Sequence, residues 1–275
     1  MTIKVWWQDI LPDADQSMIY QDKELLKACD QIIIENLKKV AREDTIIDFH
    51  HVKHSSYIVQ ASYLEMLNNV WLIDGIIEAE KQGYDAAIIG CGNDPGLQQA
   101  RQAVDIPVVG PTEAAMLLAC TMGFKFGVIT VMEDFISVCE RNIHNYGLDW
   151  RATKPVRVYQ LGDNPYVALS RMILDPKVIN PQFEELCRAC IADGAEVIIP
   201  ACATLSPAIS LLGYREVPGT GVPVIDVTQT AVKMAELLVD LKRSVGLGKS
   251  QKSSCKSVPQ KLRDRMRLQT KCTAA

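Results

Sequence analysis

The sequence has no long hydrophobic run and none of the common nucleotide-binding signatures. No apolar stretch reaches the ~18 residues of a membrane helix, and the opening stretch MTIKVWWQDILPDADQ lacks the apolar centre of a signal peptide. P-loop, GxGxxG and GxSxG motifs are also missing, which weakens nucleotide-binding and serine-hydrolase interpretations. We therefore expect a cytoplasmic protein with no membrane partner.

A disulfide framework and a nucleic-acid-binding body are also disfavoured. The nine cysteines are an odd count scattered through predicted strands and helices, as expected of reduced thiols. Residues 242–275 carry ten Lys/Arg and one Asp, a charge of +9, so the first 241 residues carry −13 within the net −4. An acidic body argues against a nucleic-acid partner.

Residues 244–275 form a basic tail that we predict to be flexible and solvated. The alternative is that the tail contacts an acidic partner or the protein's own acidic body.

Strands and helices alternate with short links, which predicts mainly parallel α/β sheets. The pattern restarts at Phe124, and IPVVGPTEAAMLLA parallels VPVIDVTQTAVKMA later in the chain. This internal duplication predicts two pseudo-symmetric Rossmann-like lobes with a cleft between them. We assign residues 1–115 and 224–243 to lobe 1, and residues 116–223 to lobe 2.

Two cysteines follow buried strands at matching positions of the two halves. Cys91 follows AAIIG, and we expect a helix to begin at Pro95; Cys202 follows EVIIPA, with Ser206 and Pro207 as the expected helix start. Helix amino ends would favour thiolate over thiol. Two such thiols across a cleft can act as a proton-relay pair, one removing a proton from a carbon acid and the other returning a proton on the opposite face.

Small polar residues surround both cysteines. Asn93, Thr130 and Thr204 are candidates for binding substrate oxygens, with helix capping and turn formation as the equal alternative. Asp94 is a further candidate, although capping is favoured there.

Other groups of metal-binding residue types have simpler explanations. His50, His51 and His54 form HHxxH without an acid to complete a metal site, and Cys187 and Cys190 share one face of a helix. We expect no metal.

The stretches CGNDPGLQQAR, PVVGPTEAAM, FGVITV with ERNIHNYGL, and DGAEVIIPACATLSP resemble the aspartate/glutamate/hydantoin racemase superfamily, most of all its hydantoin and allantoin racemase branch. The resemblance spans about residues 3–241. It implies two α/β lobes, no cofactor, Cys91 and Cys202 as the acid/base pair, and a homo-oligomer. It also implies substrate contacts from Asn93, Thr130 and Thr204.

Two departures from that branch lie at the expected pocket. Trp7, Gln8 and Asp9 stand where the branch usually has an Asn-Pro-Asn loop that binds substrate polar groups. Ala203 and Thr204 stand where a glycine-containing turn is usual. We place Trp7, Gln8, Ala203 and Thr204 among the substrate-binding residues, with a tryptophan as an aromatic wall.

The leading hypothesis is a cofactor-independent racemase or epimerase for a small molecule, a 5-substituted hydantoin or related cyclic amide. The alternatives are a maleate-isomerase-like cis-trans isomerase or a decarboxylase of the same superfamily, and a non-catalytic protein that binds a small ligand.

Overall fold

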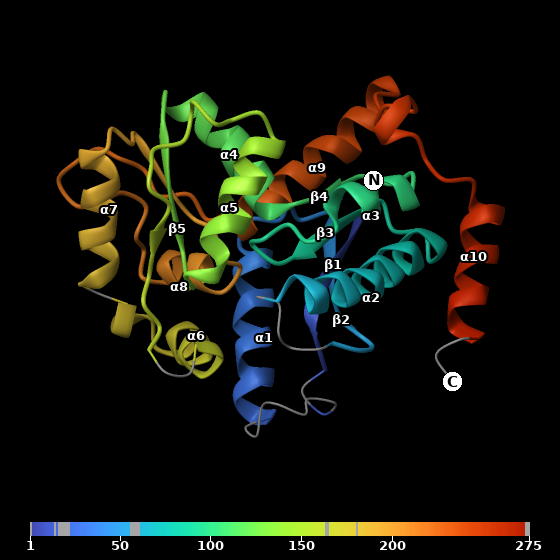
Figure 1. Ribbon diagram of the computed structural model, residues 1–275, viewed down its shortest axis with the longest axis horizontal. Coiled ribbons are helices and arrows are strands. Elements are labelled where there is room, and N and C mark those ends of the chain that lie inside the picture. Colours follow the sequence, from blue (N-terminus) through green and yellow to red (C-terminus); the bar gives the residue numbers. More distant parts are fainter. Residues whose placement is uncertain are drawn as a thin grey trace.

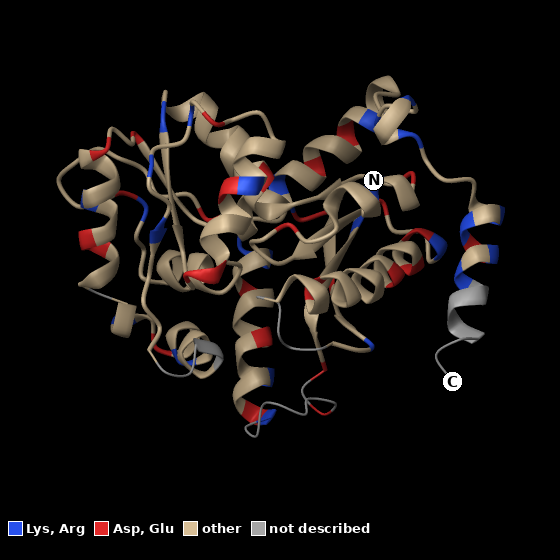
Figure 2. Cartoon of the chain, viewed as in Figure 1, with Lys and Arg blue, Asp and Glu red and all other residues tan. Residues whose placement is uncertain are grey.

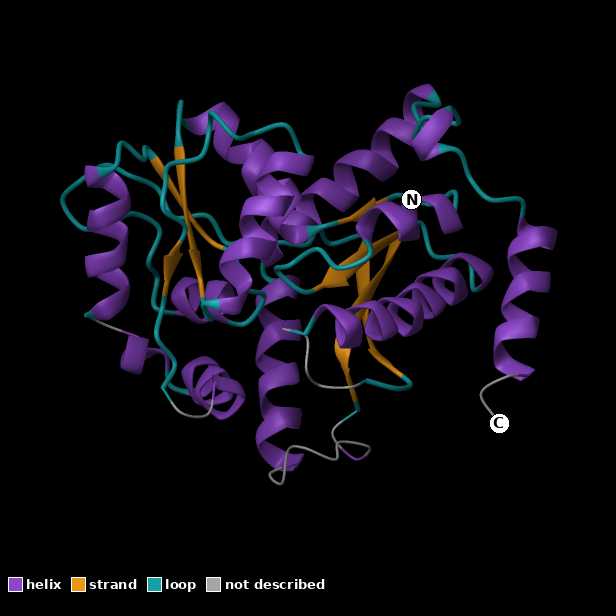
Figure 3. Ribbon diagram, viewed as in Figure 1, coloured by secondary structure: helices purple, strands orange, loops and turns teal. Residues whose placement is uncertain are grey.

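The computed structural model describes residues 2–13, 15, 23–55, 61–162, 165–179 and 181–272. These residues form two α/β lobes, each built around a parallel sheet, as Figures 1 and 3 show. The strands are β1 (Ile3–Pro12), β2 (Thr45–Val52), β3 (Ala86–Gly90), β4 (Val108–Val109), β5 (Phe126–Thr130), β6 (Arg157–Val158) and β7 (Val197–Pro200). The α-helices are α1 (Lys23–Lys38), α2 (Ser62–Lys81), α3 (Leu97–Ala103), α4 (Pro111–Met122), α5 (Asp134–Asn145), α6 (Pro165–Leu174), α7 (Gln182–Ala192), α8 (Leu205–Leu211), α9 (Val227–Val245) and α10 (Gln260–Cys272). Two short 3₁₀ helices are η2 (Pro176–Ile179) and η3 (Ser253–Cys255).

The sheet of the first lobe has the order β2-β1-β3-β4, with every pair parallel. Its central strands are buried on both faces, which explains their nearly continuous apolar sequences. Trp7 of β1 pairs with Ile88 of β3, and Asp9 pairs with Gly90. The carboxyl ends of β1 and β3 therefore lie side by side, directly before Cys91.

The sheet of the second lobe repeats this order as β6-β5-β7, again parallel. An isolated parallel bridge between Ile198 and Val224 extends it, as β4 extends the first sheet beside β3. The predicted fold class, two similar lobes with parallel sheets, is confirmed. The strand that precedes each cysteine occupies the same place in its sheet.

Two neighbouring helices carry the chain from one lobe to the other. Helix α4 follows β4 of the first sheet and leads to β5 of the second, and α9 returns to pack on the first sheet. The two helices pack against each other, at the top of the view in Figure 1. Asp226 caps α9, because its carboxylate accepts hydrogen bonds from the N–H groups of Thr228 (2.9 Å) and Gln229 (3.1 Å).

Several predicted element boundaries are wrong. The loop expected after Trp7 is part of β1, which continues to Pro12. Helix α3 begins at Leu97 rather than Pro95, after Gly96 in a left-handed conformation. Helix α8 begins at Leu205, so Ser206 lies inside it, where its hydroxyl accepts a hydrogen bond from the N–H of Val227 (2.9 Å).

Most described residues of the basic tail are exposed, but several of them contact the first lobe. The Lys249 ammonium donates to the carbonyl oxygen of Arg101 in α3 and to that of Val104, just beyond the helix. The backbone N–H of Val258 donates to the carbonyl of Gln102 at 2.8 Å. Figure 2 shows Lys and Arg at the end of α9 and along α10. The structure therefore supports the alternative in which the tail contacts the protein's own acidic body.

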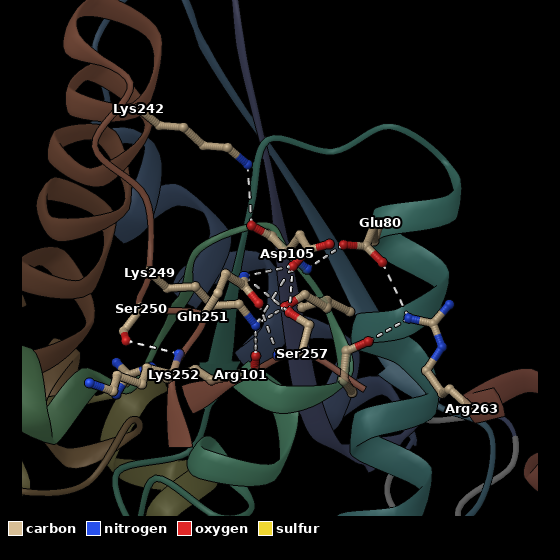
Figure 4. A network of polar contacts seen from close by, with 12 residues as sticks. Glu80, Arg101, Asp105, Lys242, Lys249, Ser250, Gln251, Lys252, Ser257 and Arg263 are labelled. Atoms are coloured by element: carbon tan, nitrogen blue, oxygen red, sulfur yellow. Dashed lines mark hydrogen bonds and ion pairs between the residues drawn. The ribbon is translucent and has the colours of Figure 1, made fainter. Parts of the chain in front are cut away.

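One arginine of the tail is buried. The Arg263 side chain is only 6% exposed and donates to the Glu80 carboxylate of α2 at 3.3 Å and to the carbonyl of Ala103 (Figure 4). Asp105 contributes a second acidic contact, since it accepts hydrogen bonds from Gln251 and Ser257. The tail thus joins α2 to the loop between α3 and β4.

Across the described ranges, no helix is long and apolar enough to cross a membrane.

Candidate active site

A cavity of about 130 Å³ lies between the lobes, at the carboxyl ends of β1, β3 and β7. Both Cys91 and Cys202 line it, one from each lobe. This edge of a parallel α/β sheet is where ligands usually bind. Most of the remaining wall is apolar and comes from β1, α1, α6 and the start of α5, with side chains that include Trp7, Ile10, Leu11, Leu26, Ile33, Met132, Phe135 and Leu169.

The loop that carries Cys91 is fixed by hydrogen bonds from the inter-lobe helix and from the second lobe. The Thr112 hydroxyl of α4 donates to the carbonyl of Gly92 at 2.5 Å. The Asn142 amide of α5 donates to the carbonyl of Asn93 at 2.8 Å. Because the loop backbone is held on both sides, the Cys91 thiol has a defined position in the cavity.

The two cysteine loops are in direct backbone contact. A Cβ atom built on Gly92 would lie 2.5 Å from the carbonyl oxygen of Ala201 and 2.8 Å from the Cα of Cys202. No side chain fits in that space. Gly92 therefore allows the Cys91 loop of one lobe to approach the Cys202 loop of the other.

Both thiols have raised pKa values, contrary to the sequence-based expectation. Burial raises the pKa of Cys91, and the charges of Asp94 and Asp9 raise it further, while the backbone N–H of Asn93 lowers it. Burial also raises the pKa of Cys202. Its sulfur accepts from the N–H groups of Thr204 and Leu205, each at 3.5 Å. The helix amino end acts as predicted, but burial outweighs it.

Four of the predicted substrate-binding residues line the cavity. They are Trp7, Asn93, Ala203 and Thr204. The predicted aromatic wall is formed by Trp7, whereas Trp6 lies on the other face of the sheet and stacks on His50.

Gln8 does not line the cavity. Since β1 continues past it, strand alternation turns its side chain away from the face that Trp7 occupies. The Gln8 side chain is fully buried, accepts from the Trp6 indole at 2.9 Å and packs so closely on Gly75 of α2 that no Cβ fits there. Its role is structural.

Asp94 is buried but lies behind the cavity wall. Its carboxylate accepts hydrogen bonds from the N–H groups of Thr112 (3.1 Å) and Glu113 (2.7 Å) and from the Tyr146 hydroxyl (2.9 Å). Asp94, predicted to contact substrate, does not line this cavity, and its carboxylate instead caps the amino end of α4. Burial raises the pKa of Asp94 to about 7.

Thr130 is also absent from the cavity wall. It is the last residue of β5, is fully buried and lies against Cys139 of α5. The cavity is lined instead by the next residue, Val131. Thr130 therefore lies one position before the residue at the cavity wall, because neighbouring strand residues point to opposite faces.

A polar cluster at one side of the cavity was not predicted from the sequence. Asp9 and Asp30 line the cavity, and His51 lies beside them. Alternation along β1 from Trp7 is the signal that marks Asp9 as facing the same way. Asp30, on α1, and Ser170, on α6, reach the cavity only through tertiary packing, so no local pattern marks them.

The three histidines of HHxxH have separate surroundings. His50 stacks on Trp6 with ring centroids 3.3 Å apart, His51 pairs with Asp30, and His54 lies beside Trp71. Within the described residues, no three His, Cys, Asp or Glu side chains are grouped as metal ligands. Cys187 and Cys190 are buried in the core of the second lobe.

Comparison with known proteins identifies relatives of this chain. The Asp/Glu/Hydantoin racemase family matches residues 28–235. The chain is 32% identical over 208 residues to a hydantoin racemase of Pseudomonas sp. (strain NS671), covering 74% of this chain and 78% of that protein. It is 38% identical over 165 residues to a hydantoin racemase of Rhizobium meliloti, covering 60% and 64%.

Solved structures show the same fold. An allantoin racemase from Klebsiella pneumoniae superposes with a TM-score of 0.75 at 24% identity, over 94% of both chains. The sequence matches and the shared two-lobe fold agree, and the chain belongs to the Asp/Glu/Hydantoin racemase family.

Proposed function

We propose that this protein is a cofactor-independent racemase or epimerase that inverts a carbon next to a carbonyl in a small cyclic amide, with 5-substituted hydantoins as the first substrate class. The observation that carries this proposal is the presence of two thiols, one from each lobe, on the wall of one cavity. The hydantoin racemases among the relatives support the substrate class.

The proposed chemistry needs only the two cysteines. The thiolate of one takes the proton of the substrate carbon, so that an S–H bond forms and a C–H bond breaks while the electron pair moves onto the adjacent carbonyl as an enolate. The thiol of the other then gives its proton to the opposite face, which forms the new C–H bond. The two sulfurs exchange protonation states, and the reverse reaction starts from the other cysteine.

The surroundings of the thiols suit a strong base. A thiolate in a buried, mostly apolar cavity is less solvated and more basic than one in water, as the raised pKa values of Cys91 and Cys202 express. Asn93 and Thr204 lie beside the sulfurs and are the side chains we assign to the enolate oxygen. Trp7 and Phe135 offer flat and apolar surface for the ring and its substituent.

The test is proton NMR in D₂O with enantiopure 5-substituted hydantoins, wild type and the variants Cys91→Ser and Cys202→Ser. With wild type we expect loss of the α-proton signal together with loss of optical rotation. Neither change should occur with Cys91→Ser or with Cys202→Ser. Exchange that survives both substitutions would overturn the two-thiol mechanism. Turnover of maleate or decarboxylation of a malonate, with no exchange of hydantoins, would instead support the isomerase or lyase alternatives.

A binding protein is distinguished by the same variants. It would keep its ligand affinity after either substitution and would exchange no proton. The homo-oligomer and the cytoplasmic location stay predictions.

A further inference from the structure

The charged side chains at the cavity wall are all acidic. Asp9 and Asp30 line the cavity, whereas no Lys or Arg does so in the part of the chain that the structure describes. Residues 1, 14, 16–22, 56–60, 163–164, 180 and 273–275, which fall outside that description, contain no Lys or Arg either. A substrate carboxylate would therefore meet no Lys or Arg at the wall that the structure describes.

A positive charge beside the wall is already paired with one of these carboxylates. His51 Nε2 lies 3.2 Å from an Asp30 oxygen, and its Nδ1 lies 3.2 Å from the carbonyl oxygen of Leu11. Both ring nitrogens face acceptors, so both carry protons and the ring is an imidazolium. Burial opposes this charge, but the hydrogen bond to Asp30 and the negative charges of Asp9 and Asp30 outweigh it and raise the pKa of His51 to about 9.

Asp9 leaves this cluster with a net negative charge. Its carboxylate accepts from the N–H of Leu11 at 2.9 Å and is 8% exposed, toward the cavity. Burial raises the pKa of Asp9 to about 6, against the effect of His51, so the group is ionised at pH 8. Two carboxylates and one imidazolium give a charge of −1 beside an apolar cavity, where charges act more strongly than in water.

Asp9 also lies close to the reacting centre. It follows Trp7 on the same face of β1, pairs in register with Gly90, and is near enough for its charge to act on Cys91. A substrate carbon held between the thiols places its substituent or its ring atoms beside this carboxylate.

We infer that Asp9 is a specificity-determining residue, which makes the cavity select cyclic amides with a cationic or N–H-rich substituent and reject those with a carboxylate. The inference rests on the proposed function, since it names the substrate class of the same site. Electrostatic complementarity of this kind acts by attraction of one class and by repulsion of the other.

The experiment compares three hydantoins at pH 8 that differ in the charge of the 5-substituent: 4-aminobutyl, isobutyl and 2-carboxyethyl. For wild type we expect kcat/KM for the aminobutyl compound to exceed that for the carboxyethyl compound at least about 100-fold. In Asp9→Asn, which keeps the size and removes the charge, this ratio should fall at least about tenfold. The isobutyl compound reports the separate effect of the lost charge on Cys91, which is common to all three substrates. Asp48→Asn is the matched control, since Asp48 lies on the neighbouring strand, hydrogen-bonded to Tyr84 and outside the cavity.

A second variant and a binding measurement keep the inference separate from the proposed racemisation. Asp30→Asn, which removes the other carboxylate, must shift the ratio in the same direction. Binding of the three compounds to Cys202→Ser, measured by calorimetry, must show the same order. Equal loss on all three substrates in Asp9→Asn, or no binding of the aminobutyl compound, overturns the inference. Charge-selective binding without proton exchange overturns the proposed racemisation alone.

Discussion

Gly92 in the first lobe lies against Ala201 in the second, at a distance that excludes any side chain on Gly92. This contact sets how closely the two cysteine loops approach each other. The contact involves no substrate, so a substitution of Gly92 tests directly whether the lobes must meet for activity.

Gly92→Ala should abolish catalysis. Its new Cβ would lie 2.5 Å from the Ala201 carbonyl oxygen and would push the cysteine loops apart. Because a displacement of about 1 Å can cost about 100-fold in rate, we expect a loss of at least that size in kcat for α-proton exchange. Gly248→Ala is the control, since no atom lies near that position. A Gly92→Ala enzyme with nearly normal kcat would show that the lobes need not approach this closely.

Asp94 should act on kcat and stability rather than on substrate affinity. Asp94→Ala removes the acceptor of three hydrogen bonds at the amino end of α4, the helix whose Thr112 also holds the Cys91 loop. We expect a loss of about 2–3 kcal/mol in the free energy of unfolding, and about 1 kcal/mol for Tyr146→Phe, measured in urea. A rise in KM of more than tenfold with unchanged kcat would restore the substrate contact predicted from the sequence.

The stability of the fold should fall between pH 6.5 and 9 because of His51. Its pKa is about 9 in the folded protein and about 6.5 when unfolded. The folded state therefore holds the proton more tightly, and the stabilisation present below pH 6.5 is lost as the pH rises through 9. Asp9 titrates near pH 6, below this window.

The measurement is the free energy of unfolding of wild type and His51→Asn across that range. Wild type should lose on the order of 2 kcal/mol more than the variant. His144→Asn serves as the control, since the His144 side chain is 77% exposed. Parallel pH profiles for wild type and His51→Asn would mean that His51 is not protonated in the fold.

The two cysteines should differ in reactivity. The Cys202 sulfur accepts hydrogen bonds from two backbone N–H groups, whereas Cys91 has that of Asn93 and the added negative charge of Asp94 and Asp9 nearby. Since the thiolate is the nucleophile, iodoacetamide at pH 8 should alkylate Cys202 several-fold faster than Cys91, as followed by peptide mass spectrometry. Faster labelling of Cys91 would mean that Cys91, not Cys202, is the more reactive thiol.

Arg263 should contribute to the stability of the first lobe. Arg263→Ala leaves the Glu80 carboxylate, 13% exposed, without this cation. Loss of one partner of a buried pair costs about 3 kcal/mol, which urea unfolding would detect. Arg265→Ala, at an exposed position of α10, should change stability by less than about 0.5 kcal/mol. Equal effects of the two substitutions would mean that the tail is flexible, as its composition predicts.

The sequence predicted those features of the fold and the site that are determined by residues close together in the chain. The strands before Cys91 and Cys202 are short apolar runs that end at the cysteines, and their matching positions in the two halves predicted a shared cavity correctly. Gln8 was misplaced because nothing in the local pattern shows that β1 continues to Pro12.

Other errors arose from contacts between distant parts of the chain. Asp94 looks like a local turn residue or a ligand, but its partners are on α4 and at Tyr146, directly after α5. Asp30 and Ser170 line the cavity only because α1 and α6 meet across the lobes. Most of the tail is exposed, as its composition predicts, but composition does not reveal that Arg263 has an acceptor on α2.

The paired helices α4 and α9 join the two lobes on one side of the molecule. Both passages of the chain between the sheets lie on that side, while α1 of one lobe and α6 of the other meet on the opposite side (Figure 1). There the Cys29 thiol donates to the carbonyl of Ser170 at 3.4 Å. Rotation about the α4–α9 pair would open the α1–α6 side while both crossings stay intact. Such a rotation would part α1 from α6 and separate Gly92 from Ala201, which would give a small molecule a route to the cavity.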